Sequence, residues 1–196
     1  MAYVYWITGL SGAGKTSIGK LLYERMKPQY PDIVFLDGDV LREVFGNDLG
    51  YTRGERIKCA MRYARLCKML QEQDLNVICC TISMFDDIRD WNRQNIENYR
   101  EIYVRVSMEV LQKRNQKGLY GTSMEVLTQR NQKGLYSTSK EVSQKRNQED
   151  LNKGDGQVAG IHVDIEEPKN PDLILDNEGD VDLSELVDNI VKKFGI

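Results

Sequence analysis

The sequence has 196 residues and a formal net charge of −3, with 40% hydrophobic and 29% charged residues. This length suits a single domain, residues 1–196, and the negative charge excludes a protein that binds nucleic acid through bulk electrostatics. No run predicts a membrane span and the first residues match no signal or transit peptide, so we expect a cytoplasmic protein that contacts no membrane. Four cysteines and one histidine lack zinc-site spacing, which predicts reduced core thiols.

The first apolar run, residues 3–8, leads into a glycine-rich stretch that fits the pattern G-x-x-x-x-G-K-[ST]. In this pattern backbone N–H groups turn inward around the phosphates of a nucleotide. Apolar residues then recur at helical spacing up to Met26, as a strand–loop–helix unit requires. We therefore expect Lys15 to neutralise the terminal phosphates of ATP and the Thr16 hydroxyl to bind Mg²⁺. The residues expected to hold ATP are Gly9, Leu10, Ser11, Gly12, Ala13, Gly14, Lys15, Thr16 and Ser17.

The next apolar run, residues 33–36, ends in two carboxylates, Asp37 and Asp39. The carboxyl ends of strands in an open α/β sheet form its ligand-binding edge. One of the two aspartates is expected to organise Mg²⁺ together with Thr16, and we assign this role to Asp37. The other is expected to accept or orient the proton of an attacking hydroxyl. A short helix follows, ended by Gly46, and each aspartate, Asp39 above all, is also a candidate for its N-cap.

The rest of the chain predicts helices and strands in alternation. A loop over residues 48–56 leads into a helix with apolar residues at 57, 60, 64 and 67. Arg53, Arg56 and Arg62 at the ligand-facing end of this helix either face a ligand or form a solvated surface. Residues 75–83 predict a central strand, 86–100 a helix, 101–106 a strand, 172–176 a fifth strand and 183–194 a closing helix capped by Ser184 or Asp182. This order predicts an α/β fold, a three-layer sandwich with a mainly parallel five-stranded sheet covered on both faces.

A sixteen-residue unit occurs three times, at residues 107–122, 123–138 and 139–154. Each copy predicts a short helix followed by a turn, and the third copy has the fewest apolar residues to anchor it. A tandem duplication within a mobile segment is the favoured interpretation, and a dedicated binding module is the alternative. We treat residues 107–154 as a helical lid insertion within the domain.

Five motifs occur in the order found in adenylyl-sulfate (APS) kinases, and the sequence resembles that family over nearly its whole length outside the extra repeats. They are residues 9–16, Leu36-Asp37-Gly38-Asp39 with Arg42, residues 48–51 before Glu55-Arg56, Ile82-Ser83, and Lys117-Gly118-Leu119-Tyr120. The resemblance implies a P-loop kinase that transfers the γ-phosphoryl group of ATP to the ribose 3′-hydroxyl of adenylyl sulfate, as a monomer or a homodimer.

The resemblance also implies roles for single residues. Arg42 and Arg56, with Arg62 nearby, grip the anionic groups of the nucleotide substrate, and Tyr51 stacks on its base. Ile82 and Ser83 line the pocket, while Arg114 and Lys117, with Arg130 or Arg146 as alternatives to Arg114, belong to a lid over the nucleotides. Ser83 also matches a serine described in the family as a phosphorylated intermediate, a catalytic role that direct in-line transfer does not need.

The sequence departs from the family pattern where the acceptor is expected to bind. Residues 58–62 replace Glu-Asn-Ile-Arg-Arg, which removes an amide and one arginine, Met84 replaces a proline, and residues 158–161 replace Phe-Thr-Gly-Ile. Losing that aromatic face costs about 1–3 kcal/mol of base stacking. Divergent relatives phosphorylate other nucleotide conjugates such as cytidine diphosphoramidate, which is the second hypothesis for the acceptor. A non-catalytic ATP-binding interaction protein is the rival from another class.

Overall fold

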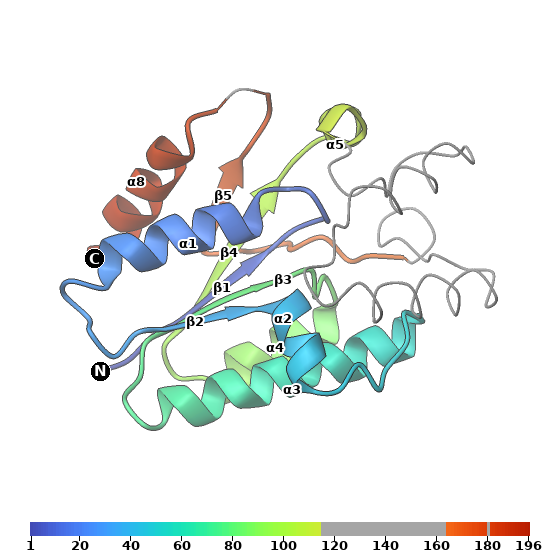
Figure 1. Cartoon of the computed structure of the whole chain (residues 1–196), viewed down its shortest axis with the longest axis horizontal. Helices are drawn as coiled ribbons and strands as arrows, with labels where there is room; N and C mark the ends of the chain where they lie inside the picture. Colours follow the sequence, from blue (N-terminus) through green and yellow to red (C-terminus); the bar gives the residue numbers. More distant parts are fainter. Residues whose placement is uncertain (115–163, 180) are drawn as a thin grey trace.

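The computed structural model describes residues 1–114, 164–179 and 181–196, in which strands and helices alternate along the chain (Figure 1). The elements, in order, are β1 (Val4–Thr8), α1 (Lys15–Met26), β2 (Val34–Asp37), α2 (Gly38–Val44), α3 (Arg53–Gln71), β3 (Val77–Thr81), α4 (Asp86–Asn95), β4 (Tyr99–Arg105), α5 (Met108–Arg114), β5 (Leu173–Asp176) and α8 (Leu183–Phe194). The predicted α/β class and all five predicted strands are confirmed.

The strands form one parallel sheet in the order β2-β3-β1-β4-β5. Val4 of β1 is aligned with Val77 of β3 on one side and with Tyr99 of β4 on the other. Every residue of β1 and β3 is buried, as parallel strands covered on both faces require. The sequence predicted residues 75–83 as the central strand; β3 is an interior strand, but β1 takes the centre. All carboxyl ends lie at one edge, which holds the site.

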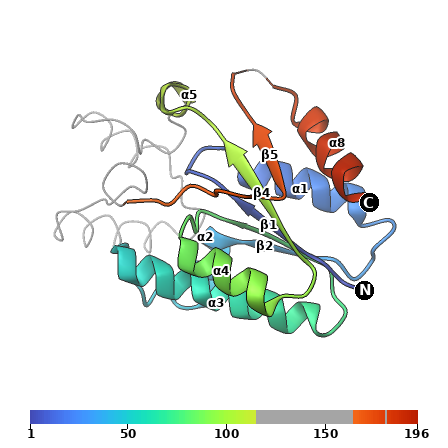
Figure 2. The same ribbon diagram turned by 180° about the vertical axis from the view of Figure 1, so that it is seen from behind.

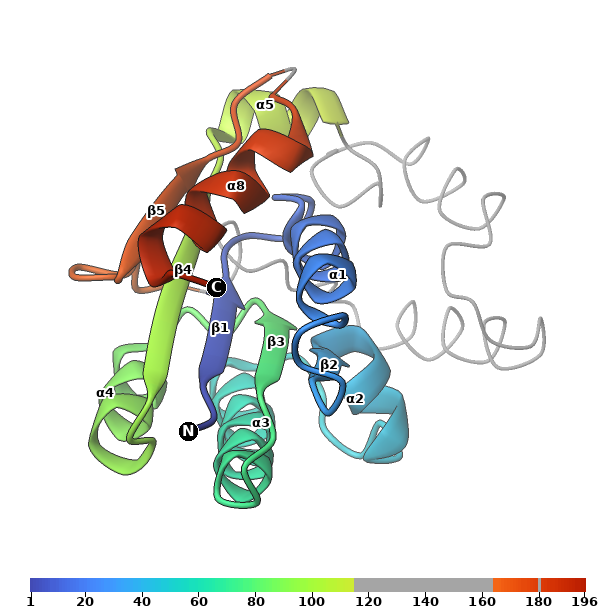
Figure 3. The ribbon, with the colours of Figure 1, turned by 90° about the vertical axis from the view of Figure 1, so that its left-hand side faces the viewer.

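Helices cover both faces of the sheet: α1 and α8 lie on one face, and α3 and α4 lie on the other (Figures 2 and 3). Each face has its own hydrophobic core, because neighbouring strand residues point to opposite sides. Ile7 packs with Leu22 and Ile190 beneath α1 and α8, whereas Trp6 packs with Ala64 beneath α3 and α4. These two cores fix α1 and α3, whose first turns border the site.

The helix predicted over residues 86–100 is shorter than expected. It ends at Asn95, Ile96 adopts extended backbone angles, and β4 begins at Tyr99, which pairs with Val4. Ile96 and Tyr99 are both buried in the core beneath α3 and α4. Burial and strand pairing override local helical propensity here, since that propensity is weak compared with tertiary packing.

Only the start of the predicted insertion lies within the described residues. The helix α5 confirms the first turns of the first copy, with Leu111 buried against the core beneath α1 and α8. The remainder of that copy and the other two copies lie outside the described residues. In the parts of the chain that the structure describes, no helix is long and apolar enough to cross a bilayer.

Candidate active site

The loop between β1 and α1 has the backbone conformation that its glycines predict. Gly9 and Gly14 have φ values of 151° and 95°, and Gly14 is the N-cap of α1. A Cβ atom at Gly9 would lie 2.4 Å from the carbonyl oxygen of Val104, so only glycine fits there. The twelve-residue helix α1 therefore directs its N-terminus, with its partial positive charge, at the space that the loop encloses.

The two residues after Gly14 tie this loop to the rest of the site. Lys15 Nζ donates a hydrogen bond of 2.7 Å to the carbonyl oxygen of Leu10, which joins the two ends of the loop. The Thr16 hydroxyl donates one of 2.7 Å to Asp37 Oδ2 at the end of β2. A hydroxyl and a carboxylate are hard oxygen donors of the kind that Mg²⁺ takes. The structure therefore brings together Thr16 and Asp37, the two residues assigned to the metal.

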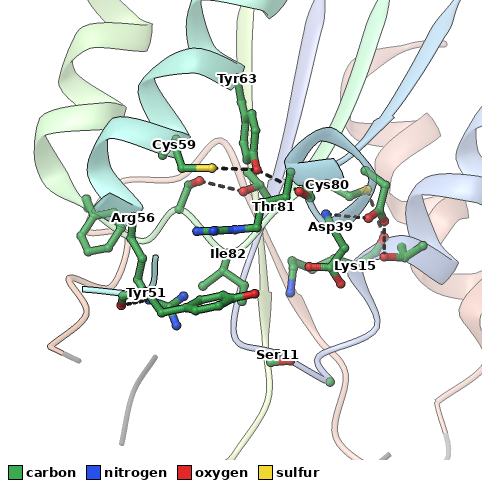
Figure 4. Close-up of a pocket in the computed structure, with 18 of the residues that line it drawn as sticks. Ser11, Lys15, Asp39, Tyr51, Arg56, Cys59, Tyr63, Cys80, Thr81 and Ile82 are labelled. Carbon is green, nitrogen blue, oxygen red and sulfur yellow. Dashed lines mark hydrogen bonds between the residues drawn. The ribbon is translucent and has the colours of Figure 1, made fainter. Parts of the chain in front are cut away.

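Asp37, not Asp39, is the N-cap of α2. Asp37 Oδ1 accepts a hydrogen bond of 3.0 Å from the N–H of Asp39 and one of 3.5 Å from that of Val40. The sequence-based preference for Asp39 as the cap was wrong, because α2 begins at Gly38 and places Asp39 in its first turn. The Asp39 side chain lines the cavity, on the same side as Lys15 and Ser11 (Figure 4).

A cavity of about 230 Å³ opens at the carboxyl edge of the sheet, between the glycine-rich loop, α2 and the start of α3. Figure 4 shows Lys15 and Asp39 on one side of it and Tyr51 and Arg56 on the other. It thus has one wall that suits phosphates and an opposite wall with an aromatic ring and cations. Its lining comprises Ser11, Gly12, Gly14, Lys15, Thr16, Ser17, Asp37, Gly38, Asp39, Arg42, Tyr51, Arg56, Cys59, Ala60, Tyr63, Cys80, Thr81, Ile82, Ser83 and Phe85.

Two arginines flank the ring of Tyr51. The guanidinium carbons of Arg42 and Arg56 lie 4.4 and 5.2 Å from the ring centroid, within cation–π range. Arg42 also donates to the carbonyl oxygens of Leu49 and Gly50, and Arg56 Nε donates to that of Tyr51. Burial, then the charge of Arg42, lowers the pKa of Arg56, which still stays cationic. A partly desolvated positive pair favours an anionic ligand beside the ring.

A tyrosine and a cysteine of α3 brace the start of α2, and the sequence analysis gave neither a role. The Cys59 thiol donates to the Tyr63 hydroxyl, which donates in turn to the carbonyl oxygen of Gly38, both over 2.9 Å. Burial, followed by the contact with Cys59, raises the pKa of Tyr63, so the hydroxyl remains a protonated donor. Because Gly38 lies between Asp37 and Asp39, this contact steadies both carboxylates.

Arg62 does not belong to the cavity lining. Its guanidinium forms two hydrogen bonds, of 2.6 and 2.8 Å, with Asp48, and this contact holds the pKa of that carboxyl below its usual range. At about 100° per residue, the six positions from Arg56 to Arg62 turn the second side chain about a third of a turn away. Of the arginines predicted to bind the substrate, Arg42 and Arg56 therefore line the cavity and Arg62 does not.

Of the remaining predicted residues, Ile82 and Ser83 line the cavity and Arg114 does not. Ser83 is 6% exposed, and its hydroxyl lies 2.7 Å from that of Thr81. Arg114 donates hydrogen bonds to the carbonyl oxygens of Asn177 and Gly179, of 2.9 and 2.8 Å. Lys117, Arg130 and Arg146 lie outside the described residues. The lid assignment therefore stays a prediction from the sequence.

Glu166 fastens the segment that precedes β5 to the rim of the cavity. Its carboxylate accepts hydrogen bonds of 2.6 Å from both Arg53 and the backbone N–H of Asp86, the first residue of α4. Arg53 lies over the ring of Phe85, a lining residue, at 5.5 Å. This contact was not predicted from the sequence, because a contact across 113 residues leaves no local pattern.

Comparison with known proteins yields a family match and several similar chains. The family model described as adenylylsulphate kinase matches residues 1–125. The cytidine diphosphoramidate kinase of Campylobacter jejuni is 37% identical over 99% of this chain and 97% of its own. The adenylyl-sulfate kinase of Halothermothrix orenii is 36% identical, over 59% of this chain and 62% of its own. The probable adenylyl-sulfate kinase of Archaeoglobus fulgidus is 29% identical over 91% of this chain and 97% of its own.

A solved structure supports the fold. The Mycobacterium tuberculosis APS kinase in complex with AMPPNP and APS superposes with a TM-score of 0.75 at 23% identity, covering 100% of this chain and 98% of its own. A sequence identity of 23% supports a shared fold and nothing further. It agrees with the P-loop kinase sandwich predicted from the sequence.

Proposed function

This chain belongs to the adenylylsulphate kinase family, and we propose that it transfers the γ-phosphoryl group of ATP to the ribose 3′-hydroxyl of a nucleotide conjugate. Members of this family are phosphotransferases that act on a hydroxyl group. The observation that carries the proposal is the cavity itself, in which a glycine-rich phosphate loop, with Asp39 on its side, faces an arginine-flanked aromatic ring. A phosphate-binding wall and a base-stacking wall thus face each other within one cavity.

ATP occupies the side formed by the glycine-rich loop in this proposal. Residues 9–17 supply backbone N–H groups and the N-terminus of α1. The Lys15 ammonium group binds the terminal phosphates and neutralises part of their negative charge. Thr16 and Asp37 would hold Mg²⁺, which supplies charge neutralisation of those phosphates when bound. No cluster of three acidic, cysteine or histidine residues suited to a metal occurs in the described ranges, which fits an ion held partly by phosphate oxygens.

Asp39 serves as the base for the acceptor. It accepts the proton of the 3′-hydroxyl as the bond from O3′ to the γ-phosphorus forms and the bond from that phosphorus to the leaving oxygen of ADP breaks. Arg42 and Arg56 hold the anionic end of the acceptor while Tyr51 stacks on its base. Ser83 is assigned to the wall rather than to a covalent role, because its hydroxyl is buried against Thr81.

We place cytidine diphosphoramidate ahead of adenylyl sulfate as the acceptor, which reverses the order of the sequence-based hypotheses. The similarity to the Campylobacter jejuni cytidine diphosphoramidate kinase extends over 99% of this chain, against 59% for the Halothermothrix orenii adenylyl-sulfate kinase. A phosphoramidate ends in an N–H donor, whereas a sulfate offers only acceptor oxygens. Around Cys59 this chain lacks an amide and an arginine, which are both hydrogen-bond donors. The site therefore suits cytidine diphosphoramidate, which has an N–H donor, better than adenylyl sulfate, which needs donors from the protein.

Steady-state kinetics with Mg·ATP and each acceptor test this assignment. Cytidine diphosphoramidate is expected to give a kcat/KM at least about tenfold above that of adenylyl sulfate, which corresponds to about 1.4 kcal/mol. The double substitution Cys59→Asn with Met61→Arg restores the missing amide and arginine and is expected to narrow that ratio. A higher kcat/KM with adenylyl sulfate than with cytidine diphosphoramidate in the unaltered protein would make adenylyl sulfate the favoured acceptor.

The rival reading as a non-catalytic ATP-binding protein finds less support. Such a protein has no use for the Asp39 carboxylate in the cavity lining, nor for Arg42 and Arg56 beside an aromatic ring. Nucleotide binding without turnover of any acceptor would favour it. ATP hydrolysis that ignores acceptors would instead indicate an ATPase switch.

A further inference from the structure

Asn177 connects the end of the sheet to the glycine-rich loop. It follows directly after β5, is 3% exposed, and its backbone N–H donates to the carbonyl oxygen of Arg105 over 3.0 Å. Its side-chain Nδ2 donates a buried hydrogen bond of 2.9 Å to the carbonyl oxygen of Ala13. This bond spans 164 positions of the sequence and reaches the residue before Gly14.

Arg114 determines which way the amide of Asn177 faces. One guanidinium nitrogen of Arg114 lies 3.3 Å from Asn177 Oδ1, 2.9 Å from its carbonyl oxygen and 2.8 Å from that of Gly179. Guanidinium nitrogens only donate, so they hold the amide oxygen on the Arg114 side. The NH₂ group must then point at Ala13, where the opposite orientation would set two acceptor oxygens against each other.

Gly14 leaves the space that this contact needs. A Cβ atom built on Gly14 would lie 2.7 Å from Asn177 Nδ2, and the residue has a φ of 95°. The amide therefore packs directly on the residue that caps α1. Any shift of Asn177 moves the backbone that begins the helix, and with it the N–H groups of the phosphate loop.

We infer that Asn177 is a positioning residue for the phosphates of ATP, and that Arg114 acts through it. It holds the Ala13–Gly14 backbone in the conformation in which the loop N–H groups converge. The inference rests on the proposed function, since it assumes that ATP binds this loop. It gives Arg114 a part at the base of the loop, in addition to the lid role that the family resemblance implies.

The substitution Asn177→Asp separates positioning from packing. It preserves size and the contact with Arg114, but sets a carboxylate oxygen against the Ala13 carbonyl oxygen. We expect the Kd for Mg·ATP to rise about tenfold and the KM for the acceptor to stay within about twofold. Lowering the pH protonates the introduced carboxylate and restores a donor, so the defect is expected to shrink in acid, whereas a defect of packing alone would persist.

Asn95→Asp is the control for the substitution itself, since the exposed Asn95, the last residue of α4, donates a bond of similar length, 2.8 Å, from Nδ2 to the carbonyl oxygen of Trp91. It is expected to leave both constants unchanged. Arg114→Ala is expected to weaken ATP binding, and the double variant with Asn177→Ala to be no weaker than Asn177→Ala alone, because both act on one contact.

Titration of each variant with Mg·ATP, together with its melting temperature, decides the matter. An unchanged ATP Kd in Asn177→Asp would overturn the inference, as would equal losses for ATP and acceptor that follow a fall in melting temperature. Failure of the unaltered protein to bind Mg·ATP would instead overturn the proposed function. The two failures are therefore distinguishable.

Discussion

The Thr16 hydroxyl donates its hydrogen bond to one carboxylate oxygen of Asp37, while the other oxygen of Asp37 caps α2. A single side chain thus links the first turn of α1, which borders the phosphate loop, to the helix that carries Asp39. The distance between the donor and acceptor halves of the cavity depends on this side chain. In the proposed mechanism, Asp37 therefore couples the Mg²⁺ site to Asp39, the proposed base.

Asp37→Asn is expected to reduce kcat about 100-fold and to raise the Mg²⁺ concentration needed for half-maximal rate, because an amide cannot offset the charge of the metal. Asparagine caps helices as well as aspartate does, so the melting temperature is expected to hold. Asp37→Ala, by contrast, also loses about 1 kcal/mol of stability with the cap. Magnesium titrations of the rate, alongside thermal unfolding, measure both effects. An unaltered Mg²⁺ dependence in Asp37→Asn would refute the metal assignment.

Asp39→Asn is expected to lower kcat by about 10²–10⁴-fold, the usual contribution of a general base, with no loss of ATP affinity. The fold is expected to persist because Asp37, not Asp39, caps α2. Glu43→Gln on the same helix removes a carboxylate outside the cavity lining and serves as the control. Single-turnover rates and ATP titrations provide the comparison. Near-normal turnover would end the role of Asp39 as base.

Tyr63→Phe removes the hydroxyl that binds the Gly38 carbonyl oxygen. We expect a loss of about 1 kcal/mol in the free energy of unfolding and a smaller kcat, since both neighbouring carboxylates gain freedom. Burial raises the pKa of Tyr63, so its hydroxyl stays protonated from about pH 7 to about pH 9.5, below the ordinary tyrosine value of about 10. The ratio of the Tyr63→Phe activity to that of the unaltered protein should then be constant over that pH range. An alkaline loss of activity seen only in the unaltered protein would contradict this.

Tyr51→Ala is expected to raise the KM for the acceptor about tenfold, within the range for losing a base-stacking ring, and to leave the KM for ATP unchanged. Tyr51→Phe keeps the ring between Arg42 and Arg56 and is expected to behave like the unaltered protein. Initial rates with each substrate varied in turn separate the two constants. A matching rise in the KM for ATP would place Tyr51 outside the acceptor site.

The elements that could be predicted were those with local signatures. The glycine-rich loop, the apolar runs of β1 to β5 and the carboxylates after β2 each depend on neighbouring residues, and all were found where expected. The end of α4 was misplaced because pairing of Tyr99 with Val4, which lies far away in the sequence, decides it.

The contacts that brace the site join residues distant in sequence and leave no such signature. The bonds from Asn177 to Ala13 and from Arg53 to Glu166 appear only once the sheet has brought β1, β3 and β5 together. Arg62 was expected at the substrate because of its position on α3, but the direction of its side chain and its pairing with Asp48 turn it elsewhere.

Transfer of a labelled γ-phosphoryl group tests the central claim most directly. The protein would be incubated with Mg²⁺, γ-labelled ATP and cytidine diphosphoramidate or adenylyl sulfate, and the product examined by NMR. The account predicts one labelled phosphate on the ribose 3′-oxygen of the acceptor for each ADP formed. Label recovered as free phosphate with the acceptor unchanged, or attached at another oxygen, would contradict it.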